Sequence, residues 1–342
     1  MPRRFHLIPG VYAYVGRLPK GCRLCIQGTK MVIFITGVCH DNCFYCPVSP
    51  ERFGRQVAYA DEEPLQSIED LVDEALRIGA DGASITGGDP LVALEKTVRT
   101  IRVLKEVFGD EFHIHLYTSG RYATSDVLRE LEESGLDEIR FHPTAPWLME
   151  RIERAVKLLR RVRVGVEVPV LPDRVEELKS MIKWLDDIGV EFINLNEVEV
   201  SPLNVLRLSE RGYRVSKDAP VVEGSEEAAI EIVKWALNNT RRISVHYCPA
   251  GYKDSVQMRI RLIRKALRVM KPYEELTSQG MLRVKRAPVN PTTTRIVHEG
   301  YGEVIGNSVY FWPGLALEDE ELITRYPTRM HHLLPMEKDS AK

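Results

Sequence analysis

From residue 31 onward, short β-branched runs alternate with longer stretches in which apolar residues recur at helical spacing. This alternation predicts repeated strand–helix units around a parallel sheet. The predicted strands cover residues 31–36, 83–86, 112–118, 138–142, 163–170 and 192–197, followed by a further strand over 243–246. The predicted helices cover residues 67–78, 91–108, 124–134, 146–159, 174–188, 225–239 and 256–270. Six strands at near-regular spacing predict an α/β fold with a partial, six-stranded β/α barrel.

The regular pattern is absent at both ends of the chain and in one internal stretch. Residues 1–30 form a short N-terminal extension that contains a C-x2-C pair, and residues 31–271 form the predicted barrel. Beyond residue 271, short strands broken by Pro, Gly and Asn predict a small β-rich C-terminal region over 272–342. The irregular stretch 201–224 follows the sixth strand, so we expect it to cover the functional site.

Composition narrows the class of protein. The 342 residues are 44% hydrophobic and 28% charged, with a formal net charge of -2, which gives no overall attraction to nucleic acid or to anionic membranes. No apolar run approaches the roughly 20 residues that a membrane-spanning helix needs. We therefore expect a cytoplasmic protein. Glutamine is scarce while Arg, Lys and Glu are abundant, a bias typical of thermophiles.

The cysteines are concentrated near the first strand. Five of the six lie between residues 22 and 46, and Cys39, Cys43 and Cys46 follow that strand with C-x3-C-x2-C spacing. A four-iron cluster normally takes four thiolates, so three close cysteines leave one iron open to another ligand. Two alternatives remain open. Cys22 and Cys25 could join Cys43 and Cys46 in a four-cysteine zinc site of a non-catalytic module, or the first two could form a disulfide.

The cysteine motif, with Tyr45 before its last cysteine and a buried strand before its first, resembles the radical S-adenosylmethionine (SAM) superfamily. Within it, the spacing resembles archaeal relatives of the pyruvate formate-lyase activating enzyme, over residues 31–200 approximately. Thr86-Gly87-Gly88-Asp89-Pro90, after the second strand, is similar to the family's Gly-Gly-Glu segment, with aspartate in place of glutamate. The two glycines allow close backbone approach to a ligand, and the carboxylate can hold an ammonium group.

The resemblance implies further SAM-binding positions at the ends of later strands. With Tyr45, Gly87, Gly88 and Asp89, these positions are Thr118, Ser119, His142 and Glu167. Each also has a structural interpretation: a turn at the first two, a strand end at His142, and a buried carboxylate at Glu167. The sixth strand has polar residues largely at alternate positions, from which we expect substrate contacts or structural hydrogen bonds by Asn194, Asn196 and Glu197.

The resemblance also implies the chemistry. A [4Fe-4S] cluster and SAM would generate a 5'-deoxyadenosyl radical that abstracts hydrogen from an unidentified substrate, in an oxidoreductase or transferase reaction. A flavodoxin- or ferredoxin-like electron donor is implied. Activation of a glycyl-radical protein and modification of RNA are alternative roles.

Two groups of residues remain outside that assignment. Cys22, Cys25 and Cys248 could bind a second iron-sulfur cluster or a zinc ion, or remain unligated thiols; a hairpin at Gly28-Thr29-Lys30 would direct the first two towards the barrel mouth. The predicted helix 256–270 is strongly basic, with Arg261, Arg264, Lys265 and Arg268 on one face. This face could bind RNA, or acidic neighbours could neutralise it.

Overall fold

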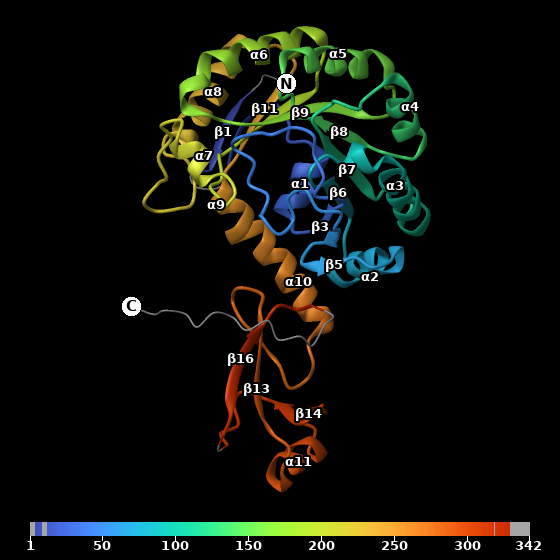
Figure 1. Cartoon of the computed structure of the whole chain (residues 1–342), viewed down its shortest axis with the longest axis vertical. Helices are drawn as coiled ribbons and strands as arrows, with labels where there is room; N and C mark the ends of the chain where they lie inside the picture. The colour runs from blue at the N-terminus through green and yellow to red at the C-terminus, as the bar shows by residue number, and fades with distance from the viewer. Residues whose placement is uncertain (1–3, 9–11, 318, 329–342) are drawn as a thin grey trace.

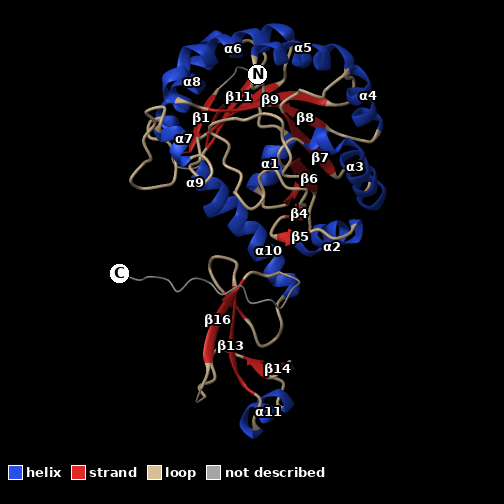
Figure 2. Cartoon of the chain, viewed as in Figure 1, coloured by secondary structure: helices blue, strands red, loops and turns tan. Residues whose placement is uncertain are grey.

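The computed structural model describes residues 4–8, 12–317 and 319–328, which form two sheets of different kinds (Figures 1 and 2). The larger sheet has eleven strands, seven of which are parallel. In spatial order, the parallel strands are β11 (Ser244–Cys248), β10 (Phe192–Asn196), β9 (Arg163–Pro169), β8 (Glu138–Phe141), β7 (His113–Thr118), β6 (Gly82–Thr86) and β3 (Lys30–Phe34). The predicted strands, including the one over 243–246, are confirmed.

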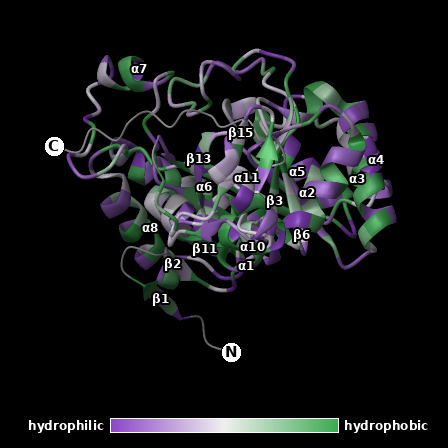
Figure 3. Cartoon of the chain, turned by 90° about the horizontal axis from the view of Figure 1, so that it is seen from below, coloured by the Kyte–Doolittle hydropathy of each residue, from purple (hydrophilic) through white to green (hydrophobic). Residues whose placement is uncertain are grey.

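Helices cover the outer face of this curved sheet. They are α2 (Ile68–Ile78), α3 (Leu94–Phe108), α4 (Ser125–Glu133), α5 (Met149–Leu158), α6 (Val175–Ile188) and α8 (Ser225–Asn239). Local signals define their ends: Ser67 and Asp70 form a capping box at the start of α2, and Gly79 ends it at a positive φ of 61°. Helices α3 and α4 carry both hydrophilic and hydrophobic residues (Figure 3), because each buries one face against the sheet.

The sheet is open, with short antiparallel strands at its two edges. β1 (Phe5–Ile8) and β2 (Tyr12–Val15) form a pair that extends the sheet beyond β11, while β4 (Tyr59–Ala60) and β5 (Glu63–Pro64) extend it beyond β3. The N-terminal extension therefore contributes strands to the main sheet. The boundaries expected at residues 30 and 271 stay a prediction.

The segment expected to form a hairpin before β3 is instead the helix α1 (Lys20–Ile26), so that prediction is wrong. Figure 1 shows α1 enclosed by the curve of the sheet, where it contacts β3, β6 and β7. Gly21 permits this position, because a Cβ there would lie 2.5 Å from the His115 ring and 2.7 Å from the Arg140 guanidinium. α1 thus fills part of the barrel interior and brings Cys22 and Cys25 into it.

The irregular stretch after β10 contains the short helix α7 (Val205–Ser209) and packs over the cysteine loop. Leu171, Val198, Leu208 and Val222 form a small apolar cluster against which Phe44 and Tyr45 pack. The Asn204 side chain donates hydrogen bonds to the carbonyls of Tyr45 (3.0 Å) and Glu199 (2.9 Å). This stretch covers the loop, as the sequence predicts.

The C-terminal region is a separate antiparallel sheet, in agreement with the β-rich pattern. It contains β12 (Glu275–Leu276), β13 (Leu282–Pro288), β14 (Gly302–Ile305), β15 (Ser308–Phe311), β16 (Glu321–Arg325) and the helix α11 (Pro291–His298). Its small core includes Ala287, Ile296, Val309 and Phe311. The helix α10 (Arg259–Val269) connects it to the larger sheet (Figure 1).

The basic face of α10 is turned towards the protein. Arg261 pairs with Asp61 and Glu62, while fully buried Lys265 pairs with Glu63 (3.1 Å) and Glu74 (2.8 Å). Arg264 donates to the carbonyls of Ile78 (3.1 Å) and Gly79 (2.9 Å). Acidic residues and a helix end therefore engage these three side chains, whereas Arg268 is exposed. Most of this face is neutralised within the protein, and RNA binding stays a prediction. Across the part of the chain that the structure describes, no helix is long and apolar enough to span a membrane.

Candidate functional site

All six cysteines line one cavity of about 630 Å³ within the curve of the main sheet. Cys39, Cys43 and Cys46 come from the loop between β3 and β4, Cys22 and Cys25 from α1, and Cys248 from the end of β11. None forms a disulfide. The volume lies within the range of about 300 to 1,000 Å³ that is typical of ligand sites. The disulfide alternative for Cys22 and Cys25 is therefore not the arrangement observed.

The loop that carries Cys39, Cys43 and Cys46 is fixed by an ion pair at its centre. Asp41 accepts hydrogen bonds from Arg121 Nη2 (2.6 Å) and Thr144 Oγ1 (2.9 Å), which follow β7 and β8. Burial alone would raise the pKa of Asp41, but Arg121 and neighbouring hydroxyl groups outweigh it and lower that pKa. An ionised Asp41 thus ties the loop to the ends of two strands.

The three loop thiols are half-buried, and burial raises the pKa of each; that of Cys43 is raised to about 11. Without metal they are neutral thiols at pH 7, and each gives up its proton when its sulfur binds iron. Three thiols on one short loop, facing a cavity of this size, fit a cluster with an iron open to a second ligand.

Gly87 and Gly88 bring the end of β6 against the backbone that leads to Cys39. The amide of Gly88 donates to the Thr36 carbonyl (2.7 Å), and that of Asp89 to the Val38 carbonyl (2.9 Å). A Cβ at Gly87 would lie 2.2 Å from the Thr36 oxygen, and one at Gly88 would lie 2.3 Å from the Val38 oxygen. Both glycines also line the cavity. They therefore place two loops side by side, a requirement that the sequence interpretation missed.

The carboxylate of Asp89 is buried behind two residues that line the cavity. It is 1% exposed and accepts hydrogen bonds from Thr118 Oγ1 (2.9 Å), Ser119 Oγ (2.7 Å), and the amides of Ser119 (3.1 Å) and Leu91 (3.0 Å). Thr118 and Ser119 line the cavity, whereas Asp89 is absent from its described lining. The expected contact between Asp89 and SAM stays a prediction, and its observed role is to position these two residues.

His142 is held as a neutral ring with a defined tautomer. Its Nδ1 lies 2.9 Å from the Glu167 carbonyl, which can only accept, so Nδ1 carries the proton. Nε2 is therefore the acceptor for the Tyr45 hydroxyl at 3.0 Å. Burial lowers the pKa of His142, which keeps the ring uncharged. Both rings line the cavity, where the sequence expectation placed them.

Glu167 is the centre of a buried polar group. It accepts from Arg140 Nη1 (2.8 Å) and from the side-chain amides of Asn194 (2.8 Å) and Asn196 (2.9 Å). Burial would raise the pKa of Glu167, but Arg140 and the two amides lower it overall. Glu197, in contrast, accepts from the Ala250 amide at 2.8 Å. All these residues except Ala250 line the cavity, so the expected SAM or substrate contacts stay predictions beside their observed structural bonds.

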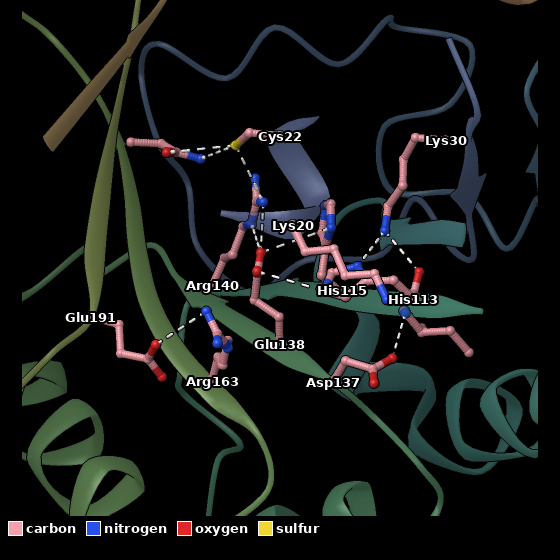
Figure 4. Close-up of polar contacts among 12 residues, drawn as sticks. Lys20, Cys22, Lys30, His113, His115, Asp137, Glu138, Arg140, Arg163 and Glu191 are labelled. Carbon is pink, nitrogen blue, oxygen red and sulfur yellow. Dashed lines mark hydrogen bonds and ion pairs between the residues drawn. The ribbon is translucent and has the colours of Figure 1, made fainter. Parts of the chain in front are cut away.

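Figure 4 shows ionisable residues around Arg140, among them the buried Lys30, His113 and Glu138. Arg140 pairs with Glu138 at 2.6 Å, and Lys30 Nζ donates to His113 Nδ1 (2.8 Å) and its carbonyl (2.8 Å). Burial lowers the pKa of Lys30 to about 7 and that of His113 to about 2. These residues were not expected from the sequence, although polar side chains at alternate positions of His113–Thr118 and Glu138–Phe141 were a usable signal.

The second set of thiols lies next to that ionisable group. Cys22 Sγ accepts hydrogen bonds from Arg140 Nη2 (3.5 Å) and Asn194 Nδ2 (3.4 Å). Burial raises the pKa of Cys22 and of Cys248 to about 12, although Arg140 and Lys253 oppose the rise. No trio of His, Cys, Asp or Glu within 4–8, 12–317 and 319–328 is arranged to hold a single metal ion. The alternative zinc site of Cys22, Cys25, Cys43 and Cys46 is therefore not preformed among the described residues.

Comparisons with known proteins agree with the cysteine motif. A family model described as the Radical SAM superfamily matches residues 33–185. A candidate glycyl-radical enzyme activating enzyme of Methanocaldococcus jannaschii is 39% identical over 276 residues, which are 78% of this chain and 72% of that protein. A candidate GTP 3',8-cyclase of Thermococcus kodakarensis is 26% identical over 240 residues, covering 66% of this chain and 73% of that protein.

Among solved structures, the coproporphyrinogen III oxidase of Escherichia coli, a radical SAM enzyme, aligns with a TM-score of 0.40 and 10% identity. The alignment covers 86% of this chain and 90% of that one.

Proposed function

The chain belongs to the radical SAM superfamily, and on that premise we propose that Cys39, Cys43 and Cys46 bind the [4Fe-4S] cluster of an enzyme that activates a glycyl-radical protein. When bound, the cluster would supply the electron for cleavage of SAM to methionine and a 5'-deoxyadenosyl radical, and that radical would abstract hydrogen from the substrate. The observation that carries this proposal is one cavity lined by these three thiols together with Gly87, Gly88 and the ends of β7 and β8.

The chain's own residues bind and orient the two cofactors. Asp41 fixes the cysteine loop through Arg121, and Asp89 fixes Thr118 and Ser119 at the cavity wall. The neutral ring of His142 holds the Tyr45 hydroxyl, and the Tyr45 side chain also interacts with the Cys43 thiol. None of these residues needs to transfer a proton, so their proposed contribution is positioning and exclusion of water.

The charges around the cavity favour an uncharged substrate such as a glycine within a protein chain. Arg140 is paired with Glu138 and Glu167, and Lys253 with Glu199 at 2.6 Å. Arg261 is paired with Asp61 and Glu62. The described Lys and Arg side chains of the cavity wall are thus already neutralised. A nucleoside triphosphate would bring several negative charges to this wall, and burying unpaired charge is costly. GTP is therefore the less suitable substrate.

We also propose a reaction class, an electron donor and a second metal group. We assign the reaction to hydrogen abstraction, an oxidation of the substrate, with a flavodoxin- or ferredoxin-like protein as the electron donor. Cys22, Cys25 and Cys248 are the residues that we propose for a second metal group, iron-sulfur or zinc.

The experiment follows hydrogen from substrate to product. The anaerobically reconstituted enzyme is incubated with SAM, dithionite and the glycyl-radical proteins of the same genome, each prepared with α-deuterated glycine. We expect deuterium in 5'-deoxyadenosine and a glycyl-radical signal in the electron paramagnetic resonance spectrum. The Cys43→Ala variant should form neither. Consumption of GTP, with no deuterium transfer from any of these proteins, would overturn the proposal.

A further inference from the structure

Half of the cysteines in the cavity have no part in holding the SAM cluster. Cys22 and Cys25 are three residues apart on α1, so they lie on one side of that helix, and Cys248 ends β11. All three line the cavity that contains Cys39, Cys43 and Cys46. Two segments far apart in the sequence therefore bring three free thiols to one space.

The surroundings of Cys22 are those of a ligand sulfur. Cys22 is 6% exposed, and its sulfur accepts one hydrogen bond from a guanidinium and one from an amide, while its thiol also lies 3.8 Å from Asn194 Oδ1 as a donor. A neutral buried thiol packs as a small apolar group and needs no such donors. Hydrogen bonds of this kind stabilise metal-bound thiolates and tune the potential of iron-sulfur clusters.

His246 lines the same cavity with a free ring nitrogen. Its Nδ1 lies 3.2 Å from Asn194 Oδ1, which can only accept, so Nδ1 carries the proton and Nε2 keeps its lone pair. The Nδ2 group of Asn194 donates to Cys22 Sγ. One asparagine thus orients the imidazole and donates to a ligand sulfur, an arrangement typical of the residues that support metal ligands.

We infer that Cys22, Cys25 and Cys248 bind a second iron-sulfur cluster in the cavity, with His246 as the side chain available to its remaining iron. This inference rests on the second metal group in the proposed function and assigns its chemistry. A zinc ion needs four ligands around one point, at about 2.0 to 2.3 Å, and no such group exists among the residues described. A cluster places each thiolate on a separate iron, so its ligands do not have to converge on one ion.

Iron and sulfide analysis of the reconstituted protein tests the inference. The wild type should contain about eight iron atoms and eight sulfides per chain, two [4Fe-4S] clusters by the usual stoichiometry. The Cys22→Ala/Cys25→Ala/Cys248→Ala variant should keep about four of each and still cleave SAM. The matched Cys39→Ala/Cys43→Ala/Cys46→Ala variant should also keep about four of each, but without cleavage.

Further outcomes separate this inference from the proposed function. About four irons in the wild type, all lost in the Cys39/Cys43/Cys46 variant, would overturn it, as would stoichiometric zinc that is lost with Cys22, Cys25 and Cys248. About eight irons without any deuterium transfer would overturn the glycyl-radical function and leave the second cluster standing. If the alanine variant fails to fold, as judged by circular dichroism, single serine substitutions replace it, and each should alter the spectrum of one cluster only.

Discussion

Ser119 is joined to Asp89 by two hydrogen bonds, one from its hydroxyl at 2.7 Å and one from its amide at 3.1 Å. Through them the buried carboxylate connects the end of β6 to the end of β7. Loops at the carboxyl ends of parallel strands carry function in β/α folds, so this connection sets the shape of the cavity wall.

Asp89→Ala should lower the free energy of unfolding by about 2 to 4 kcal/mol, because several buried donors lose a charged acceptor. Urea denaturation under anaerobic conditions measures the change. Asp126, whose side chain is 94% exposed, provides the control, and Asp126→Ala should change stability by about 0.5 kcal/mol or less. Equal effects of the two substitutions would show that the Asp89 carboxylate does not hold the wall together.

Gly88→Ala should displace the cysteine loop. The added Cβ would lie 2.3 Å from the Val38 oxygen and 2.5 Å from its carbonyl carbon, and these backbone atoms cannot move independently of the loop. We expect loss of reconstituted iron and of SAM cleavage. Gly251→Ala is the matched control, because a Cβ at Gly251 meets no atom within 4 Å. Full iron content in Gly88→Ala would contradict the proposed contact between the two loops.

The metal-free protein should become more stable as the pH rises through the range in which Lys30 titrates. The pKa of Lys30 is lowered from 10.5 to about 7 by burial, so between these values the unfolded chain binds the additional proton. Stability therefore increases with pH above about 7, by at most about 1.4 kcal/mol per pH unit. Urea denaturation from pH 7 to 9 should show a shallower slope in Lys30→Met. Lys20→Met, at a lysine whose side chain is 39% exposed, should retain the wild-type slope.

Lys265→Met should destabilise the protein by about 3 to 5 kcal/mol, because it removes the cation beside the fully buried carboxylate of Glu74. Thermal or urea unfolding measures this loss. Lys157 pairs with Glu153 on the surface, and its side chain is 73% exposed, so Lys157→Met should cost about 0.5 kcal/mol or less. A small effect at Lys265 would indicate that α10 is not held by its ion pairs.

Much of the main sheet could be predicted because short stretches of sequence define its strands and the ends of its helices. Buried strands contain consecutive β-branched residues, and glycines such as Gly79 and Gly189 end the helices between them at positive φ. The position of the cysteine loop follows from the strand that precedes it. Thr118, Ser119 and His142 reach the cavity because parallel strands end at a common edge.

The features that could not be predicted depend on contacts between residues that are far apart in the sequence. Gly21 and the two charged residues of α1 give little indication of a helix inside a barrel, since its packing against His115 and Arg140 creates the environment that stabilises it. The sequence left open whether the basic face of α10 binds RNA or is neutralised by acidic neighbours. The partners of Lys265 are Glu63 and Glu74, which lie in a remote part of the chain. Spacing along one helix cannot reveal such pairs.

Helix α10 links the C-terminal sheet to the rim of the cavity. Its ion pairs reach Asp61, Glu62 and Glu63, directly after the strand that closes the cysteine loop, and Arg261 itself lines the cavity. Ion pairs therefore fix the helix that connects the C-terminal sheet to the main sheet. A partner protein that binds to that sheet would therefore act, through α10, on the loop where the proposed radical chemistry begins.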